Sequence, residues 1–113
     1  MIQIFHNPRC RKSREGIAFL EDAKVDFEII KYLDTPPTLD ELKTILSKLD
    51  ITPIELVRKT EVIWKENFKG KELTDDEIIE AMVANPKLIE RPIIINESKA
   101  VIGRPKENIQ TIL

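Results

Sequence analysis

The chain has 113 residues, of which 42% are hydrophobic and 34% are charged, and its formal net charge at pH 7 is -2. This length suits one domain, and this composition is typical of a folded globular protein and not of a disordered chain. The charge lacks the basic excess of a nucleic-acid-binding protein, and no apolar run approaches the ~20 residues that a membrane span needs. The first residues do not resemble a secretory signal, so we expect a cytoplasmic protein with no membrane or nucleic-acid partner.

The first third of the chain predicts a strand, a helix and a second strand. Residues 2–5 form a short β-prone run that ends at a turn around Pro8, and residues 13–23 carry apolar side chains at helical spacing. Residues 26–32 are again apolar and β-prone. A strand, a helix and a strand in this order predict the βαβ unit of a parallel sheet.

The middle third predicts helices, because two capping boxes and a proline mark their starts. Thr38 and Thr74 are each followed three residues later by glutamate, so the hydroxyl and the carboxylate can satisfy the free amides of a first turn. We expect these helices to run to about Leu49 and Val83. The Thr52-Pro53 pair predicts the start of another short helix.

The last third predicts two strands at residues 93–95 and 100–102, a turn at residues 96–99 between them, and a final helix. The complete order is β-α-β, a helical insertion, and β-β-α. This order predicts an α/β fold with a thioredoxin-like mixed sheet. No linker is visible, so we expect a single domain over residues 1–113, with a helical insertion at about 38–90.

Cys10 is the one cysteine, and it stands between the first strand and the first helix. A single cysteine excludes an internal disulfide, and with one histidine we expect no metal site, so any redox partner thiol must come from another molecule. Free amides at a helix start and basic flanking residues lower a thiol pKa and also suit an oxyanion. We therefore predict a reactive thiolate and not a small buried hydrophobe. Gly16 stands where a phosphatase-type Cys-x5-Arg loop needs arginine, which disfavours that architecture.

Several neighbours could support the Cys10 thiolate. The Ser13 hydroxyl could donate to the sulfur, and Arg14 could add positive charge. His6 could orient or deprotonate the thiol, or it could be a turn histidine with a backbone partner, and the sequence leaves both open. The basic side chains next to Cys10 are also compatible with a solvated helix start, which is the better interpretation of Arg11 and Lys12.

Arginine is scarce in this chain, with six residues against twelve lysines. Three flank Cys10, and the other three are Arg58, Arg91 and Arg104. Because a planar guanidinium matches an oxyanion better than an ammonium does, we predict that these three bind an oxyanion. Pro92 precedes the third strand, where a thioredoxin-like sheet typically carries a cis-proline that faces the active-site loop, so we expect a cis bond there.

The segment from His6 to Arg14 resembles the H-N-P-x-C-x-x-S-R motif of the ArsC-type arsenate reductases, which are coupled to glutaredoxin and glutathione. Further segments are similar to other family motifs, so the resemblance runs from residue 2 to the end; these segments are 32–38, 56–59, 85–86, 90–93 and 103–105. The resemblance implies that Cys10 attacks arsenate, with support for its thiolate from His6 and Ser13.

The resemblance also implies that Arg58, Arg91 and Arg104 hold the oxyanion and its thiol adduct. Glutathione would be the co-substrate, attacking the arsenic bound to Cys10, and glutaredoxin would be the partner that reduces the adduct and releases arsenite, with no bound cofactor. Two alternatives stay open. One is an Spx-like regulator that binds RNA polymerase, which is disfavoured because Ser13 stands where those proteins have a second cysteine. The other is a general glutathione-dependent thiol reductase without an arsenic role.

Overall fold

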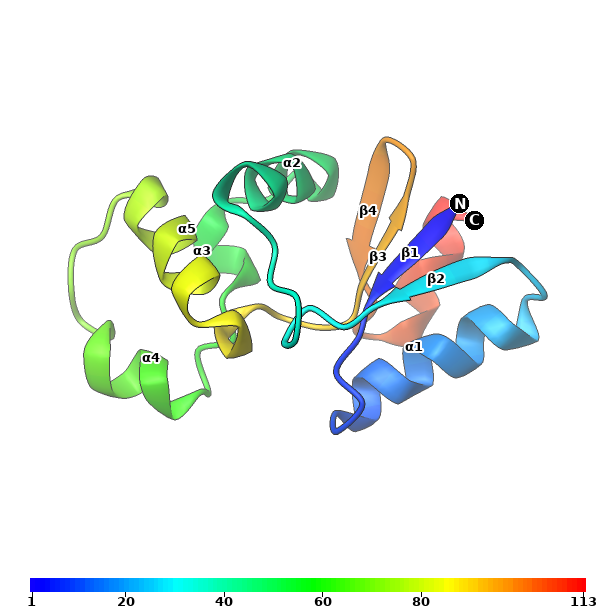
Figure 1. The fold of residues 1–113 in the computed structure, drawn as a ribbon, viewed down its shortest axis with the longest axis horizontal. Coiled ribbons are helices and arrows are strands. Elements are labelled where there is room, and N and C mark those ends of the chain that lie inside the picture. The colour runs from blue at the N-terminus through cyan, green and yellow to red at the C-terminus, as the bar shows by residue number, and fades with distance from the viewer. The chain divides into compact units, whose positions relative to one another are not determined.

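Figure 1 shows the computed structural model, which describes all 113 residues. The chain divides into two compact units, one made of residues 1–35 and 91–113 and the other of residues 36–90. No helix in either unit has the length and the apolar character that a bilayer crossing requires.

The first unit is built on a four-stranded sheet with the strand order β2-β1-β3-β4. Its strands are β1 (Ile2–Phe5), β2 (Phe27–Ile30), β3 (Ile93–Asn96) and β4 (Lys99–Ile102). Strand β1 is parallel to β2 and antiparallel to β3, and β3 is antiparallel to β4. The four predicted strands and the thioredoxin-like mixed sheet are therefore confirmed.

Two helical segments pack on this sheet, α1 (Arg11–Asp22) and the 3-10 helix η2 (Lys106–Ile112). Alternate residues of the strands point to these helices, as the period of two along a strand requires. The buried cluster that results joins sheet and helices and consists of Ile2, Ile4, Leu20, Ile94, Ile109 and Ile112. The final helix was expected, but it winds as a 3-10 helix and not as an α-helix.

The hairpin between β3 and β4 has the predicted position. Asn96 pairs with Lys99, so Glu97 and Ser98 alone form the turn. Glu97 has a φ of 57°, in the left-handed region that tight two-residue hairpin turns use.

The second unit is helical and corresponds to the predicted insertion. Its elements are α2 (Leu39–Leu49), α3 (Pro53–Leu56), α4 (Val62–Asn67), α5 (Asp75–Ala84) and the 3-10 helix η1 (Pro86–Leu88). Both predicted capping boxes are formed, at Thr38 before α2 and at Thr74 before α5. Helix α4 was not predicted, because it has six residues and its N-cap residue, Glu61, makes no side-chain capping hydrogen bond. The expectation that this insertion packs as part of a single domain stays a prediction.

Replacing Thr38 with alanine is expected to lower the free energy of unfolding by about 1 kcal/mol, because the α2 cap is lost. The Glu41 amide donates to the Thr38 hydroxyl at 3.2 Å, and the Thr38 amide donates to the Glu41 carboxylate at 3.1 Å. Urea unfolding followed by Trp64 fluorescence measures this, since Trp64 is buried in the same unit.

Thr44→Ala is the matched control, since it makes the same chemical change inside the same helix. The Thr44 hydroxyl donates to a carbonyl within the helix, that of Asp40, so its loss is expected to leave stability unchanged or slightly higher. Equal losses for the two variants would contradict the capping argument.

Candidate active site

Cys10 is the N-cap residue of α1, so its side chain stands where the free amides of the first helical turn need an acceptor. Its backbone is extended, with φ -96° and ψ 121°, and its carbonyl accepts from the Arg14 amide at 3.1 Å. The Cys10 amide in turn donates to the Asn7 carbonyl at 3.0 Å. The Cys10 side chain makes no capping hydrogen bond by the usual geometric criteria. The amides of Lys12 and Ser13 in the first turn nevertheless favour its thiolate form.

The pKa of the Cys10 thiol is lowered by a balance of opposing effects. Partial burial is the largest single effect, and it raises the pKa because a thiolate loses hydration. The Ser13 amide, a hydrogen bond from the Arg91 side chain, the Lys12 amide and the positive charge of Arg91 all act in the other direction. Together they outweigh burial, so the predicted pKa depression is confirmed. Cys10 as a residue is also only partly buried.

The positive charge that lowers the pKa of Cys10 belongs to Arg91, far along the chain, and not to the immediate neighbours of the cysteine. Arg11 and Lys12 instead pair with Glu15, at 3.5 and 3.6 Å. Their interpretation as part of a solvated helix start agrees with these contacts. Arg14 donates from Nη1 to the Pro8 carbonyl at 2.9 Å, which directs its guanidinium into the loop before Cys10.

Arg91 and Arg104 both belong to the unit that contains Cys10, and they are in contact with each other. Arg91 is buried, and its carbonyl lies 3.4 Å from Nη1 of Arg104, which donates to it. The Pro92 carbonyl accepts from the Gly103 amide at 2.8 Å. The peptide bond before Pro92 is cis, as expected, and so is the bond between Arg104 and Pro105, which no sequence feature indicated. Two of the three predicted oxyanion ligands, Arg91 and Arg104, are therefore held next to each other by hydrogen bonds between their segments.

A buried hydrogen-bond network connects His6, Asn7 and Ser13. The Ser13 hydroxyl lies 2.6 Å from Nδ1 of His6 and accepts from the Asn7 amide at 2.9 Å. Ser13 therefore acts on the sulfur through its amide, while its hydroxyl orients the His6 ring. This differs from the expectation of a hydroxyl donated to the sulfur. The His6 ring contacts the Ser13 side chain and also has a backbone hydrogen bond with Ser13, so the expectation of a backbone partner fits this structure too.

The pKa of His6 is lowered, mainly by burial and further by the positive charges of Arg14 and Lys31. A backbone hydrogen bond with Ser13 raises the pKa of His6 but is the smallest of these effects. A lowered pKa favours the neutral imidazole, so His6 is better suited to hydrogen bonding with Ser13 than to pairing with a thiolate as a cation.

Arg58 belongs to the second unit, where two carboxylates bracket its guanidinium. Its Nε lies 3.6 Å from Glu61, and its Nη1 lies 3.7 Å from Glu90. Its amide donates to the Leu88 carbonyl at 2.7 Å, next to the β-bridge between Val57 and Ile89. The backbone of Arg58 is thus fixed, and its predicted contact with an oxyanion stays a prediction.

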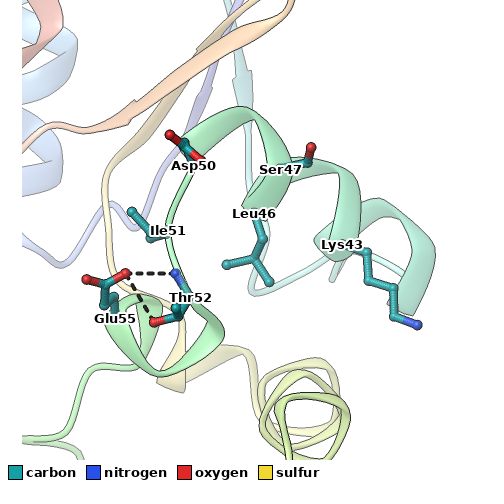
Figure 2. Close-up of a pocket in the computed structure, with 7 residues that line it drawn as sticks. All are labelled: Lys43, Leu46, Ser47, Asp50, Ile51, Thr52 and Glu55. Atoms are coloured by element: carbon teal, nitrogen blue, oxygen red, sulfur yellow. Dashed lines mark hydrogen bonds between the residues drawn. The ribbon is translucent and has the colours of Figure 1, made fainter.

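The second unit also has an open hollow of about 500 Å³ beside the end of α2 and the start of α3. Figure 2 shows the seven residues that line it: Lys43, Leu46, Ser47, Asp50, Ile51, Thr52 and Glu55. The Glu55 carboxylate accepts from the Thr52 amide at 2.7 Å and from its hydroxyl at 3.1 Å, so it serves the start of α3. The lining has neither cysteine nor histidine, so the thiol chemistry belongs to the first unit.

Comparison with known proteins points to one family. The family described as the ArsC family matches residues 5–112. The chain is 43% identical to a Neisseria meningitidis serogroup A protein named arsenate reductase, over 99% of this chain and 97% of that protein. It is 42% identical to the uncharacterized protein YfgD of Escherichia coli K12, over 99% and 96% of the two chains. A solved structure described as arsenate reductase from Vibrio cholerae matches with a TM-score of 0.94 and 41% identity, over 99% and 97% of the two chains.

Replacing Arg91 with alanine is expected to slow alkylation of Cys10 by iodoacetamide at pH 7 by about threefold to tenfold. The variant loses both a hydrogen bond to the sulfur and a positive charge beside it, so the pKa of Cys10 rises and less thiolate is present. The pH dependence of the alkylation rate measures this. Arg11→Ala is the control, since that exposed guanidinium pairs with Glu15. Equal rates for the Arg91 variant and the wild type would remove Arg91 as a thiolate partner.

His6 is the one histidine, so its imidazole signals can be followed by NMR without ambiguity. We expect it to titrate at lower pH than a free histidine. Lys31→Ala is expected to move the titration towards the ordinary value, because a positive charge that disfavours the imidazolium is removed. Lys48→Ala in the second unit is the control. A midpoint above the ordinary value would mean that the ring is held as a cation.

Proposed function

The chain belongs to the ArsC family, and we propose that it reduces arsenate to arsenite with Cys10 as the nucleophile and external thiols as the reductant. The substrate in this proposal is supported by relatives named arsenate reductase in Neisseria meningitidis and Vibrio cholerae. The mechanism is derived from the residues around the sulfur.

The observation that carries the proposal is the coincidence of a nucleophile and an anion-binding environment at Cys10. The first-turn amides and Arg91 that lower the pKa of Cys10 are also the groups that hold an oxyanion at a helix start. An arsenate bound there would place its arsenic against the sulfur. Because the anion and the thiolate are both negative, a second guanidinium is needed, and Arg104 donates to the backbone of Arg91 from close by.

The proposed reaction balances as arsenate plus two thiol groups giving arsenite, a disulfide and water. The Cys10 thiolate attacks arsenic, so an S–As bond forms and an oxygen leaves as water. An external thiol then bonds to the same arsenic, displacing a further oxygen. When the two sulfurs couple, the electron pair stays on arsenic, which passes from As(V) to As(III), and water restores arsenite. A second external thiol reduces the mixed disulfide and regenerates Cys10.

The external thiols follow from the single cysteine, because no other residue of the chain can resolve the Cys10 adduct. We assign glutathione as the co-substrate and glutaredoxin as the protein that reduces the mixed disulfide. Both assignments rest on the resemblance of the Cys10 motif to glutaredoxin-coupled arsenate reductases.

The remaining residues receive the following roles in the proposal. Arg91 and Arg104 hold the oxyanion. The resemblance to the ArsC-type reductases assigns Arg58 to the oxyanion as well, and this assignment rests on that resemblance alone. Ser13 stabilises the thiolate through its amide. His6 holds the Ser13 hydroxyl, and burial together with the positive charge of Arg14 lowers the pKa of His6.

The test is arsenate reduction with purified components, comparing wild type, Cys10→Ser and Arg11→Ala. With glutathione and glutaredoxin we expect turnover by the wild type and by the Arg11 variant, and a loss of at least about a thousandfold in the Cys10 variant. The assay follows arsenite formation directly.

Two further arms separate the parts of the proposal. Replacing glutaredoxin and glutathione by thioredoxin is expected to abolish turnover, and equal turnover with thioredoxin would overturn the assigned reductant while leaving Cys10 in place. Equal rates for wild type and Cys10→Ser would overturn the mechanism itself.

A further inference from the structure

We infer that Gly16 and Gly103 are positioning residues that form a side-chain-free slot around the ring of Pro92 and so place Arg91 against Cys10. The inference rests on the proposed function in one respect, that the Cys10 thiolate is the nucleophile. The glycines themselves contact neither the sulfur nor a substrate, and their effect passes through Pro92 and Arg91.

The two glycines approach the same ring atom from different segments of the chain. A Cβ atom at Gly16 would lie 3.0 Å from Cγ of Pro92 and 3.2 Å from Ile4. A Cβ atom at Gly103 would also lie 3.0 Å from Cγ of Pro92, and 2.9 Å from Ile94. These distances are shorter than ordinary carbon contacts, so any side chain at either position must displace its neighbours.

The close contacts that a side chain would make, and not an unusual backbone conformation, explain the glycines at positions 16 and 103. The one glycine with a positive φ is Gly70, so the backbone of Gly16 and Gly103 is accessible to other residues. Gly16 also lies inside α1, where glycine weakens a helix relative to alanine. Gly16 therefore neither favours the helix nor is needed for its φ angle. The remaining physical reason for a glycine at this position is its packing against Pro92.

Pro92 has little freedom to move away from an added side chain. It is among the fully buried residues, and its ring has no rotatable side-chain bond. Its carbonyl accepts from the amide of Gly103 at 2.8 Å, which ties the two segments together. An added methyl group at either glycine would therefore shift the backbone at residues 91–92 and not only a side chain.

This shift would reach the sulfur because each segment continues directly to the site. Cys10 caps the helix that contains Gly16, and a helix transmits displacement as a rigid element. Arg91 is bonded to Pro92, and its side chain hydrogen-bonds to the sulfur. Arg104, next to Gly103, donates to the Arg91 carbonyl. The spacing between α1 and Pro92 thus sets the distance between the thiolate and its guanidinium partner.

The first experiment measures the pH dependence of Cys10 alkylation by iodoacetamide in Gly16→Ala and Gly103→Ala, without arsenate. Each variant is expected to react about twofold to fivefold more slowly than wild type at pH 7, because a displaced guanidinium stabilises the thiolate less. Gly70→Ala is the control: it lies in the second unit, with φ 82° and no atom within 4 Å of its added Cβ. We expect a lower thermal midpoint for that variant but an unchanged alkylation profile.

The second experiment repeats each glycine substitution in an Arg91→Ala background. If the glycines act through Arg91, they add no further slowing there. The same slowing in both backgrounds would overturn the inference, because the glycines would then act on the helix amides or on the fold as a whole. Circular dichroism confirms folding, and loss of fold in both single variants would also overturn it.

The failure of this inference is distinguishable from failure of the proposed function. An ordinary thiol pKa in the wild type would remove the thiolate on which the proposed mechanism depends. A lowered pKa in the wild type, with both glycine variants unaffected, would overturn the positioning role alone.

Discussion

The lowered pKa of one thiol at the start of α1 depends on groups that several segments of the first unit bring together. Burial alone would keep that sulfur protonated, and it is the largest single effect on the pKa of Cys10. Two backbone amides and one guanidinium reverse its direction. The amides belong to the helix that Cys10 caps, while the guanidinium of Arg91 comes from a distant segment of the chain. The lowered pKa of Cys10 therefore depends on the tertiary structure.

The loop before α1 is arranged so that its hydrogen bonds are satisfied without using the sulfur. Asn7 accepts from the Arg9 amide through its side chain and donates through its own amide to Ser13. Ser13 also holds the His6 ring. With these polar groups paired among themselves, the sulfur is left as the acceptor that the first-turn amides face. A partly exposed cysteine in a preorganised loop is available for attack with little rearrangement.

The basic side chains discussed above differ in whether a carboxylate lies next to them. Arg11 and Lys12 share Glu15, and Arg58 lies between two glutamates of the second unit. Arg91 is buried and directed to the sulfur. An anion that binds near Cys10 therefore meets a guanidinium already engaged with the nucleophile, while binding at Arg58 requires exchange with a carboxylate.

The sequence by itself determined the strands and the capped helices α2 and α5, and it indicated Cys10 as the candidate nucleophile that needs an external thiol in the proposed reaction. These depend on local patterns: short runs of β-prone apolar residues, the Thr-x-x-Glu boxes, and the count of one cysteine. The sequence did not predict the short helix α4 or the 3-10 form of η2, because neither has a side-chain cap and both depend on packing, around Trp64 and Ile109 respectively. Only the tertiary structure decided that Arg91, and not the arginines adjacent to Cys10, supplies the charge, and that the Ser13 hydroxyl faces His6. The physical reason is that a side chain's partner depends on which distant segments the sheet brings together, and sequence spacing does not record that.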